Sequence, residues 1–91
     1  MYYVYVLHSQ KQKWIYTGCT DDLKTRFAQH QTGKVKSTQF YRPFTLIYYE
    51  AYLDKTDARK REIELKNNSQ QKEFLFKRIH NSVNMVPSSN G

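Results

Sequence analysis

The sequence describes one small basic domain. Its 91 residues carry 15 Lys and Arg against 8 Asp and Glu, which gives a net charge of +7. A chain of this length builds one hydrophobic core, and its 3 Gly, 2 Pro and 38 % hydrophobic residues exclude collagen-like, low-complexity and disordered classes. No apolar stretch approaches the roughly 18 residues of a membrane span. Because Cys19 is the one cysteine and no signal peptide opens the sequence, we expect a cytoplasmic protein without membrane contact.

Two strands and a helix open the predicted fold. Residues 2–8 and 14–17 are rich in β-branched and aromatic side chains, and the polar residues 9–13 between them predict a hairpin. Thr20 is a good N-cap for the helix that follows, and Gly33 marks the end of that helix.

A third strand and two further helices complete the prediction. Residues 44–52 have strand character and are long enough to form the centre of a sheet. After a second helix, residues 69–82 have the spacing of a third. We expect the domain to cover residues 1–83, with a flexible C-terminal tail over residues 84–91.

The second helix, over about residues 56–67, carries a carboxylate on its inward face. At about 100° per residue, Ala58, Glu62 and Leu65 share one side of this helix. A charge on the core side is costly unless it is paired or bound to a cation. Glu62 is therefore a candidate functional residue.

The positive charge is unevenly distributed. Residues 23–49 contain no acidic residue and five cations: Lys24, Arg26, Lys34, Lys36 and Arg42. Such a surface attracts phosphate backbones and accelerates encounters with them. It is equally typical of a solvated face that serves solubility, and charge by itself does not separate the two interpretations.

Five chemically capable side chains are spread along these elements: Tyr5, Tyr16, Arg26, His30 and Glu62. Each has an ordinary structural interpretation. The tyrosines are typical of cross-strand packing, and a histidine near a helix C-terminus is often a partner of the helix dipole. The glutamate has Arg59 and Lys66 within ion-pairing distance on its own helix.

Taken in order, the five residues resemble the GIY-YIG nuclease superfamily. The first signature reads Tyr3-Val4-Tyr5, and the second reads Tyr16-Thr17-Gly18, with its tyrosine eleven residues after Tyr5. Arg26 and His30, four residues apart, and the helix that carries Glu62 continue the match. The resemblance implies an α/β protein of the α+β type, with a three-stranded antiparallel sheet flanked by helices.

The resemblance covers about residues 2–80 and is greatest to the small stand-alone bacterial members. Tyr3 stands where the family name has Gly, and Thr17 stands where it has Ile. Cys19 occupies a position that is Lys in the excision-repair relatives. If a cation assists proton removal there, this chain must do without it or use another residue.

The chemistry that the resemblance implies is metal-dependent endonucleolytic hydrolysis of a phosphodiester. Glu62 would hold one divalent cation, Mg²⁺ or Mn²⁺, together with water and phosphate oxygens. Arg26 would hold the scissile phosphate. Tyr5 or Tyr16 would lie beside the attacking water, one of them as general base, and His30 would bond a tyrosine hydroxyl or shuttle its proton.

The expected partner is nucleic acid, with DNA favoured over RNA. Gly18 would let the strand approach closely. Further contacts are expected from the basic loop after the first helix: Lys34, Lys36, Ser37, Thr38 and Arg42. The small cationic surface leaves room for a partner protein that sets specificity. The alternative is a catalytically inactive nucleic-acid-binding module of the same fold.

Overall fold

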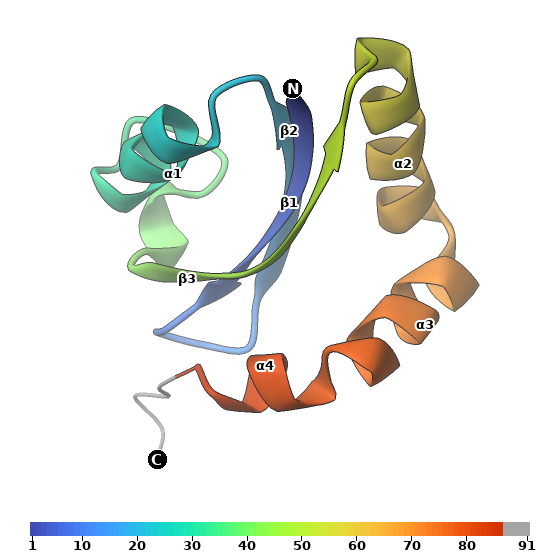
Figure 1. Ribbon diagram of the computed structural model, residues 1–91. Coiled ribbons are helices and arrows are strands. Elements are labelled where there is room, and N and C mark those ends of the chain that lie inside the picture. The colour runs from blue at the N-terminus through green and yellow to red at the C-terminus, as the bar shows by residue number, and fades with distance from the viewer. Residues whose placement is uncertain (87–91) are drawn as a thin grey trace.

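A three-stranded antiparallel sheet forms the centre of the computed structural model, which describes residues 1–86 (Figure 1). The strands are β1 (Tyr2–Ser9), β2 (Ile15–Thr20) and β3 (Phe44–Tyr52), in the order β2-β1-β3. β1 and β2 form the predicted hairpin, and β3 pairs with the other side of β1. The fold class expected from the sequence is confirmed.

The expectation that the 44–52 strand is central is wrong, because β1 takes that place. Val4, Tyr5, Val6 and Leu7 are all buried, so β1 is covered on both faces. β3 instead exposes Tyr49 and lies at an edge of the sheet. Strand length did not decide the order; apolar side chains on both faces did.

Helix α1 (Leu23–Gln31) begins two residues later than a Thr20 cap would place it. Thr20 ends β2, and the carboxylate of Asp22 caps the helix by accepting from the backbone N–H of Thr25. Beyond the helix, Gly33 has a positive φ of 79°, a conformation that favours glycine and confirms the predicted stop.

Within residues 1–86, three helices follow the sheet: α2 (Lys55–Asn67), α3 (Ser69–Arg78) and α4 (His80–Asn84). The single helix predicted over residues 69–82 is therefore two helices. The break falls at Ile79, which packs against the core beneath the sheet, so the chain bends to follow that surface (Figure 1).

The C-terminal boundary stays a prediction. Residue 84, where the tail was expected to begin, is the last residue of α4. Residues 87–91 lie outside the described part of the chain. Within residues 1–86, no helix combines the length and the apolar character needed to cross a membrane.

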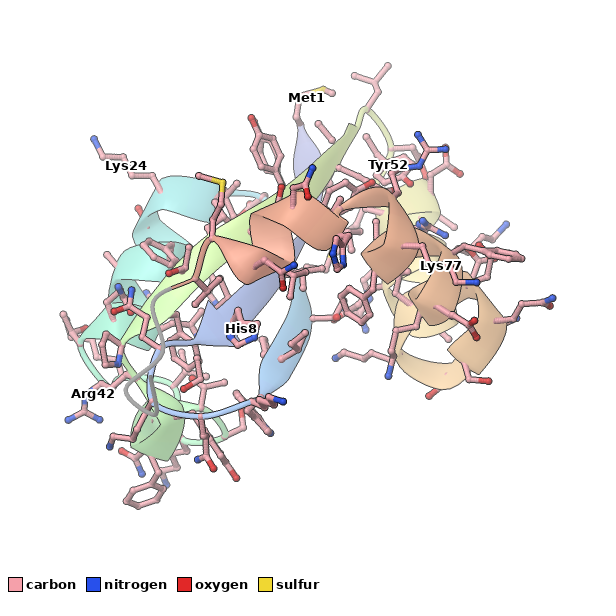
Figure 2. All side chains as sticks on the ribbon, turned by 90° about the horizontal axis from the view of Figure 1, so that it is seen from below. Met1, His8, Lys24, Arg42, Tyr52 and Lys77 are labelled. Atoms are coloured by element: carbon pink, nitrogen blue, oxygen red, sulfur yellow. The ribbon has the colours of Figure 1, made fainter. Side chains whose placement is uncertain are left out.

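Helices cover both faces of the sheet and form two cores. On one face, Val4 and Val6 pack against Ala58, Leu65 and Leu75 from α2 and α3. The other face, beneath α1 and the short 3₁₀ helix Gln39–Tyr41, buries three residues: Tyr5, Leu7 and Phe44. Figure 2 shows Lys24 and Arg42 on the α1 side and Lys77 on the α3 side. The candidate residues thus reach the site from two layers.

Candidate active site

A buried hydrogen bond joins the first tyrosine to the histidine. Tyr5, on the central strand β1, is 1 % exposed, and His30, in the last turn of α1, is fully buried. The Tyr5 hydroxyl oxygen lies 2.8 Å from His30 Nε2. Two residues that are 25 positions apart are therefore held in one fixed arrangement.

His30 has a second partner in Thr38. His30 Nδ1 lies 2.8 Å from Thr38 Oγ1, and Thr38 is also fully buried. The sequence prediction placed Thr38 on the surface as a nucleic-acid contact. The structure instead turns its hydroxyl inward, where it is used by His30. We call Tyr5, His30 and Thr38 the buried cluster.

Tyr16 lies beside the buried cluster. Its ring centroid is 5.1 Å from that of His30 and 6.3 Å from that of Tyr5. It also stacks on Trp14, with centroids 6.1 Å apart. Tyr16 is on the edge strand β2 and only half-buried, so its ring bounds the site on the solvent side.

Gly18 makes room for the tyrosines. It lies opposite Tyr5 in the β1–β2 register, and a Cβ placed on it would be 2.5 Å from Tyr5 Cζ and 2.9 Å from Tyr16 Cε2. The sequence prediction assigned this glycine to close approach of a nucleic acid. In the structure Gly18 is buried, and the absent side chain is what lets the Tyr5 hydroxyl reach His30.

Arg26 lies one turn before His30 on α1 and lowers the pKa values of both Tyr5 and His30. Burial raises the pKa of Tyr5 to about 12, against a hydrogen bond from the Arg26 side chain that lowers it. Burial also lowers the pKa of His30 to about 4, and the nearby Arg26 charge lowers it further. Both groups are therefore neutral near pH 7. Arg26 Nη1 also donates to Gln29 Oε1 at 3.1 Å.

Glu62 comes from the opposite layer and is paired twice. Ala58, Glu62 and Leu65 are the buried residues of α2, as their spacing predicts. Glu62 Oε1 lies 3.1 Å from Arg59 Nη1, and Glu62 Oε2 lies 3.1 Å from Lys66 Nζ. We call Arg59, Glu62 and Lys66 the carboxylate cluster; both ion pairs considered for Glu62 at the sequence level occur in it.

The carboxylate cluster contacts Tyr16 on β2, the residue that lies beside the buried cluster. Lys66 Nζ lies 5.6 Å from the centre of the Tyr16 ring. The charge of Glu62 also acts on Tyr5, where it opposes ionisation of the hydroxyl. Lys66 thus places a cation from α2 beside Tyr16, although position 19 carries no lysine. The i, i+4 spacing of Glu62 and Lys66 was the sequence signal for this neighbour.

The site fits a metal held by one carboxylate. Within residues 1–86, no three or more His, Cys, Asp or Glu side chains come together as a metal-binding group. The Glu62 side chain is 8 % exposed, and each of its oxygens already forms an ion pair with a basic side chain. Its partners Arg59 and Lys66 are 58 % and 44 % exposed, so they can leave at small cost. Mg²⁺, which keeps several waters, suits such a site.

The remaining predicted contacts lie on the surface around the end of α1. Four of them are exposed: Lys34, Lys36, Ser37 and Arg42. The Arg42 guanidinium covers Gly33, and its Nη1 donates to the Gln39 carbonyl oxygen at 2.5 Å. Figure 2 shows Arg42 on the α1 side of the molecule. These residues are exposed to a polyanion, and none of the described hydrogen bonds joins them to the buried cluster.

Comparison with known proteins identifies the family. The GIY-YIG catalytic domain model matches residues 1–75. A UPF0213 protein of Staphylococcus haemolyticus is 38 % identical over 74 residues, which are 80 % of this chain and 89 % of that protein. One from Lactiplantibacillus plantarum is 39 % identical over 82 residues, which are 87 % of this chain and 80 % of that protein.

A solved structure is similar as well. The solution NMR structure of a UPF0213 protein from Bacillus halodurans has a TM-score of 0.51 and 31 % sequence identity, and the match covers 81 % of each chain. The fold, the order of the site residues and these matches agree. The chain therefore belongs to the GIY-YIG family, a nuclease-type family, and its relatives are small bacterial UPF0213 proteins.

Proposed function

We propose that this protein is a metal-dependent endonuclease that hydrolyses phosphodiester bonds in nucleic acid, with DNA favoured over RNA. The observation that carries the proposal is the buried Tyr5–His30 hydrogen bond, which lies beside Arg26 and within the electrostatic reach of Glu62. Family membership supports the reaction class. The local excess of positive charge on α1 and the following loop supports a polyanionic substrate.

Arg26 binds the scissile phosphate in this proposal. Its planar guanidinium matches two phosphate oxygens and stays charged at any working pH. A phosphate bound there neutralises the charge that helps to lower the pKa of His30. Substrate binding therefore makes His30 a better proton acceptor at the moment when one is needed.

Tyr5 positions the attacking water and passes a proton inward. A free tyrosinate is unfavourable because burial raises the Tyr5 pKa to about 12. If Tyr5 takes a proton from water while giving its own to His30 Nε2, the tyrosine stays neutral throughout. Tyr16, which lacks such a hydrogen-bonded acceptor in the contacts described, orients the water and shields the pair.

Glu62 would hold the divalent cation, Mg²⁺ or Mn²⁺. A bound ion would supply charge stabilisation at the phosphate and the leaving oxygen. Arg59 and Lys66 neutralise Glu62 in its absence and can then turn to phosphate oxygens.

A catalytically inactive nucleic-acid-binding module is the second candidate. The observation that favours it is the carboxylate cluster itself, because Glu62 is fully satisfied by Arg59 and Lys66 without any metal. In that case the acidic residue serves the packing of α2 alone.

Cleavage of a labelled panel of single-stranded, duplex, flap, forked and RNA hairpin substrates separates the two candidates. The assay compares wild type with Glu62→Gln and, as a matched control, Glu64→Gln, which removes an exposed carboxylate from the same helix. We expect Mg²⁺- or Mn²⁺-dependent cleavage by wild type and Glu64→Gln, stopped by EDTA and reduced at least about a hundredfold in Glu62→Gln. Binding without cleavage in all three proteins would favour the inactive module.

A further inference from the structure

A chain of hydrogen bonds runs inward from Tyr5 and ends on the backbone. Beyond the bonds from Tyr5 to His30 and from His30 to Thr38, Thr38 Oγ1 lies 3.4 Å from the Val35 carbonyl oxygen. Tyr5, His30 and Thr38 are each buried, with 1 % exposure or less. The ring nitrogens of His30 and the hydroxyl of Thr38, which lie deepest in the chain, are therefore limited to the partners that the protein itself supplies.

The end of the chain sets its direction. The Val35 carbonyl can only accept; when the Thr38 hydroxyl donates to it, across 3.4 Å, the Thr38 oxygen is left to accept from His30 Nδ1–H at 2.8 Å. A neutral imidazole has a single N–H, which leaves Nε2 as the acceptor for the Tyr5 hydroxyl.

We propose that Thr38 is a positioning residue that holds His30 in the Nδ1–H tautomer and so keeps Nε2 open for the Tyr5 proton. Its catalytic consequence rests on the proposed function. As the water oxygen bonds to phosphorus, its O–H bond breaks and a new O–H forms on Tyr5. The original Tyr5 O–H breaks and Nε2–H forms, while the P–O bond to the leaving oxygen breaks and that oxygen takes a proton from solvent.

The test compares Thr38→Val, which has the same shape without the hydroxyl, with Thr38→Ser, which keeps the hydroxyl. Long-range ¹H–¹⁵N correlation spectra of ¹⁵N-labelled protein report the tautomer of His30 without any need for activity. We expect the Nδ1–H tautomer in wild type and Thr38→Ser, and a loss of that preference in Thr38→Val. In the cleavage assay we expect kcat to fall about tenfold or more in Thr38→Val and to recover in Thr38→Ser.

An Nε2–H tautomer in wild type would overturn the proposal, as would a Thr38→Val protein with an unchanged tautomer. If the tautomer behaves as expected but wild type cleaves nothing, the positioning role stands and the proposed function fails. If wild type cleaves and Thr38→Val keeps full activity, the proposed function stands and the catalytic consequence of Thr38 is lost.

A separate groove lies between the open edge of β2 and helix α3. It encloses about 210 Å³ and is lined by Ile15, Tyr16, Thr17, Lys66, Lys72 and Phe76. Of the residues that the structure describes, those lining this groove include two lysines and no Asp or Glu. Lys66 also contacts Glu62, so the groove begins at the carboxylate cluster and continues away from it along α3.

We infer that this groove binds the single strand of nucleic acid that leaves the proposed site. Lys66 and Lys72 match its phosphates, and the partly buried Phe76 offers an aromatic surface to its bases. The inference rests on the proposed function and gives α3 a role that no sequence motif assigned. It also places part of the strand on the side of the sheet opposite the basic loop after α1.

Fluorescence anisotropy of a labelled single-stranded DNA in EDTA tests the groove without cleavage. Lys72→Ala removes a groove cation, and Lys77→Ala removes the same charge from the same helix outside the groove. We expect Lys72→Ala to raise Kd about threefold and to lower the salt slope by roughly 0.7, with little change in Lys77→Ala. Phe76→Leu should also weaken binding while keeping an apolar side chain in the core.

Equal weakening by Lys72→Ala and Lys77→Ala would overturn the groove, since it would show a general effect of charge. Unchanged binding in Lys72→Ala, with wild type still binding and cleaving, would also overturn the groove and leave the proposed function intact. A wild-type protein that neither binds nor cleaves any member of the panel would contradict both the groove and the proposed function.

Discussion

The buried cluster and the carboxylate cluster hold their polar side chains in opposite ways. Tyr5, His30 and Thr38 are enclosed, and each is fixed by hydrogen bonds from strands, helix and loop. Glu62 is held by Arg59 and Lys66, two long side chains that are 58 % and 44 % exposed. A proton relay requires fixed distances, whereas a metal site with one carboxylate requires partners that can be exchanged. In the proposed function, the buried cluster is therefore the preorganised half of the site, and the carboxylate cluster is the half that is completed when the metal binds.

The largest effect is expected on the rate of cleavage, when the buried cluster is altered. Tyr5→Phe removes the hydroxyl that the buried cluster positions, so single-turnover cleavage should fall about a hundredfold or more. Tyr16→Phe should cost less, because Tyr16 contacts His30 through its ring. The measurement is the rate at saturating Mg²⁺ and substrate. A greater loss in Tyr16→Phe would assign the water-activating role to the other tyrosine.

The pH dependence of stability should reveal the buried cluster. The pKa of His30 is lowered from 6.5 to about 4 by burial and by Arg26, so between these pH values the unfolded chain binds a proton that the native protein excludes. The contribution of His30 to the free energy of unfolding should therefore be fully present above pH 6.5. The free energy of unfolding should fall by about 3 kcal/mol as the pH is lowered to 4. Urea unfolding at a series of pH values measures it.

His80→Gln is the matched control for this pH effect, because His80 is exposed and should leave the slope unchanged. The window lies mostly above the ordinary pKa of glutamate, 4.5, so carboxylates add little within it. A stability that stays level between pH 6.5 and 4 would contradict the enclosure of His30.

Gly18→Ala tests how tightly the buried cluster is packed. The new Cβ would meet the Tyr5 ring at 2.5 Å from Cζ, so the ring must shift away from His30. We expect a loss of about 1–3 kcal/mol in the free energy of unfolding, measured by thermal or urea denaturation. Thr17→Ala, one residue earlier on the same strand and facing the other side of the sheet, is the control. Equal stability of the two variants would show that the site tolerates a looser Tyr5.

The smallest effect is expected in the carboxylate cluster. Arg59→Ala and Lys66→Ala each leave Glu62 with one cation, and exposed partners of this kind contribute about 0.2–1 kcal/mol. Thr38→Val should cost more, about 1–3 kcal/mol, because it leaves the buried His30 Nδ1–H without a partner. Urea midpoints for the three variants give the ranking. A reversed order would mean that the carboxylate cluster is the rigid half.

Local spacing predicted much of this arrangement. The 3.6-residue period of α2 placed Ala58, Glu62 and Leu65 on the buried side, and the glycine at position 33 marked the end of α1. The two signatures with Arg26 and His30 gave the order of the site residues. The buried face of α2 and the end of α1 depend on residues within a few positions of one another, so local spacing predicts them; the order of the site residues came from the family resemblance.

Long-range contacts account for what the sequence did not show. Thr38 is polar and lies in a basic loop, and its burial depends on that loop closing over His30. Gly18 was explained by a ligand, although its neighbour is Tyr5, thirteen residues earlier on the paired strand. The helix break at Ile79 carries no Pro or Gly, because packing against the sheet, not a local signal, produces it.

The central claim is that the buried cluster is fixed while the partners of Glu62 can be exchanged for a metal. Its most direct test is a Mn²⁺ titration followed by NMR. Paramagnetic broadening should be strongest at the amides around Glu62 in α2, and the His30 ring signals should keep their tautomer throughout the titration. Glu62→Gln should abolish the site-specific broadening, and Glu64→Gln should not. Broadening that is unchanged in Glu62→Gln, or absent from wild type, would contradict the assignment of Glu62 as the metal carboxylate.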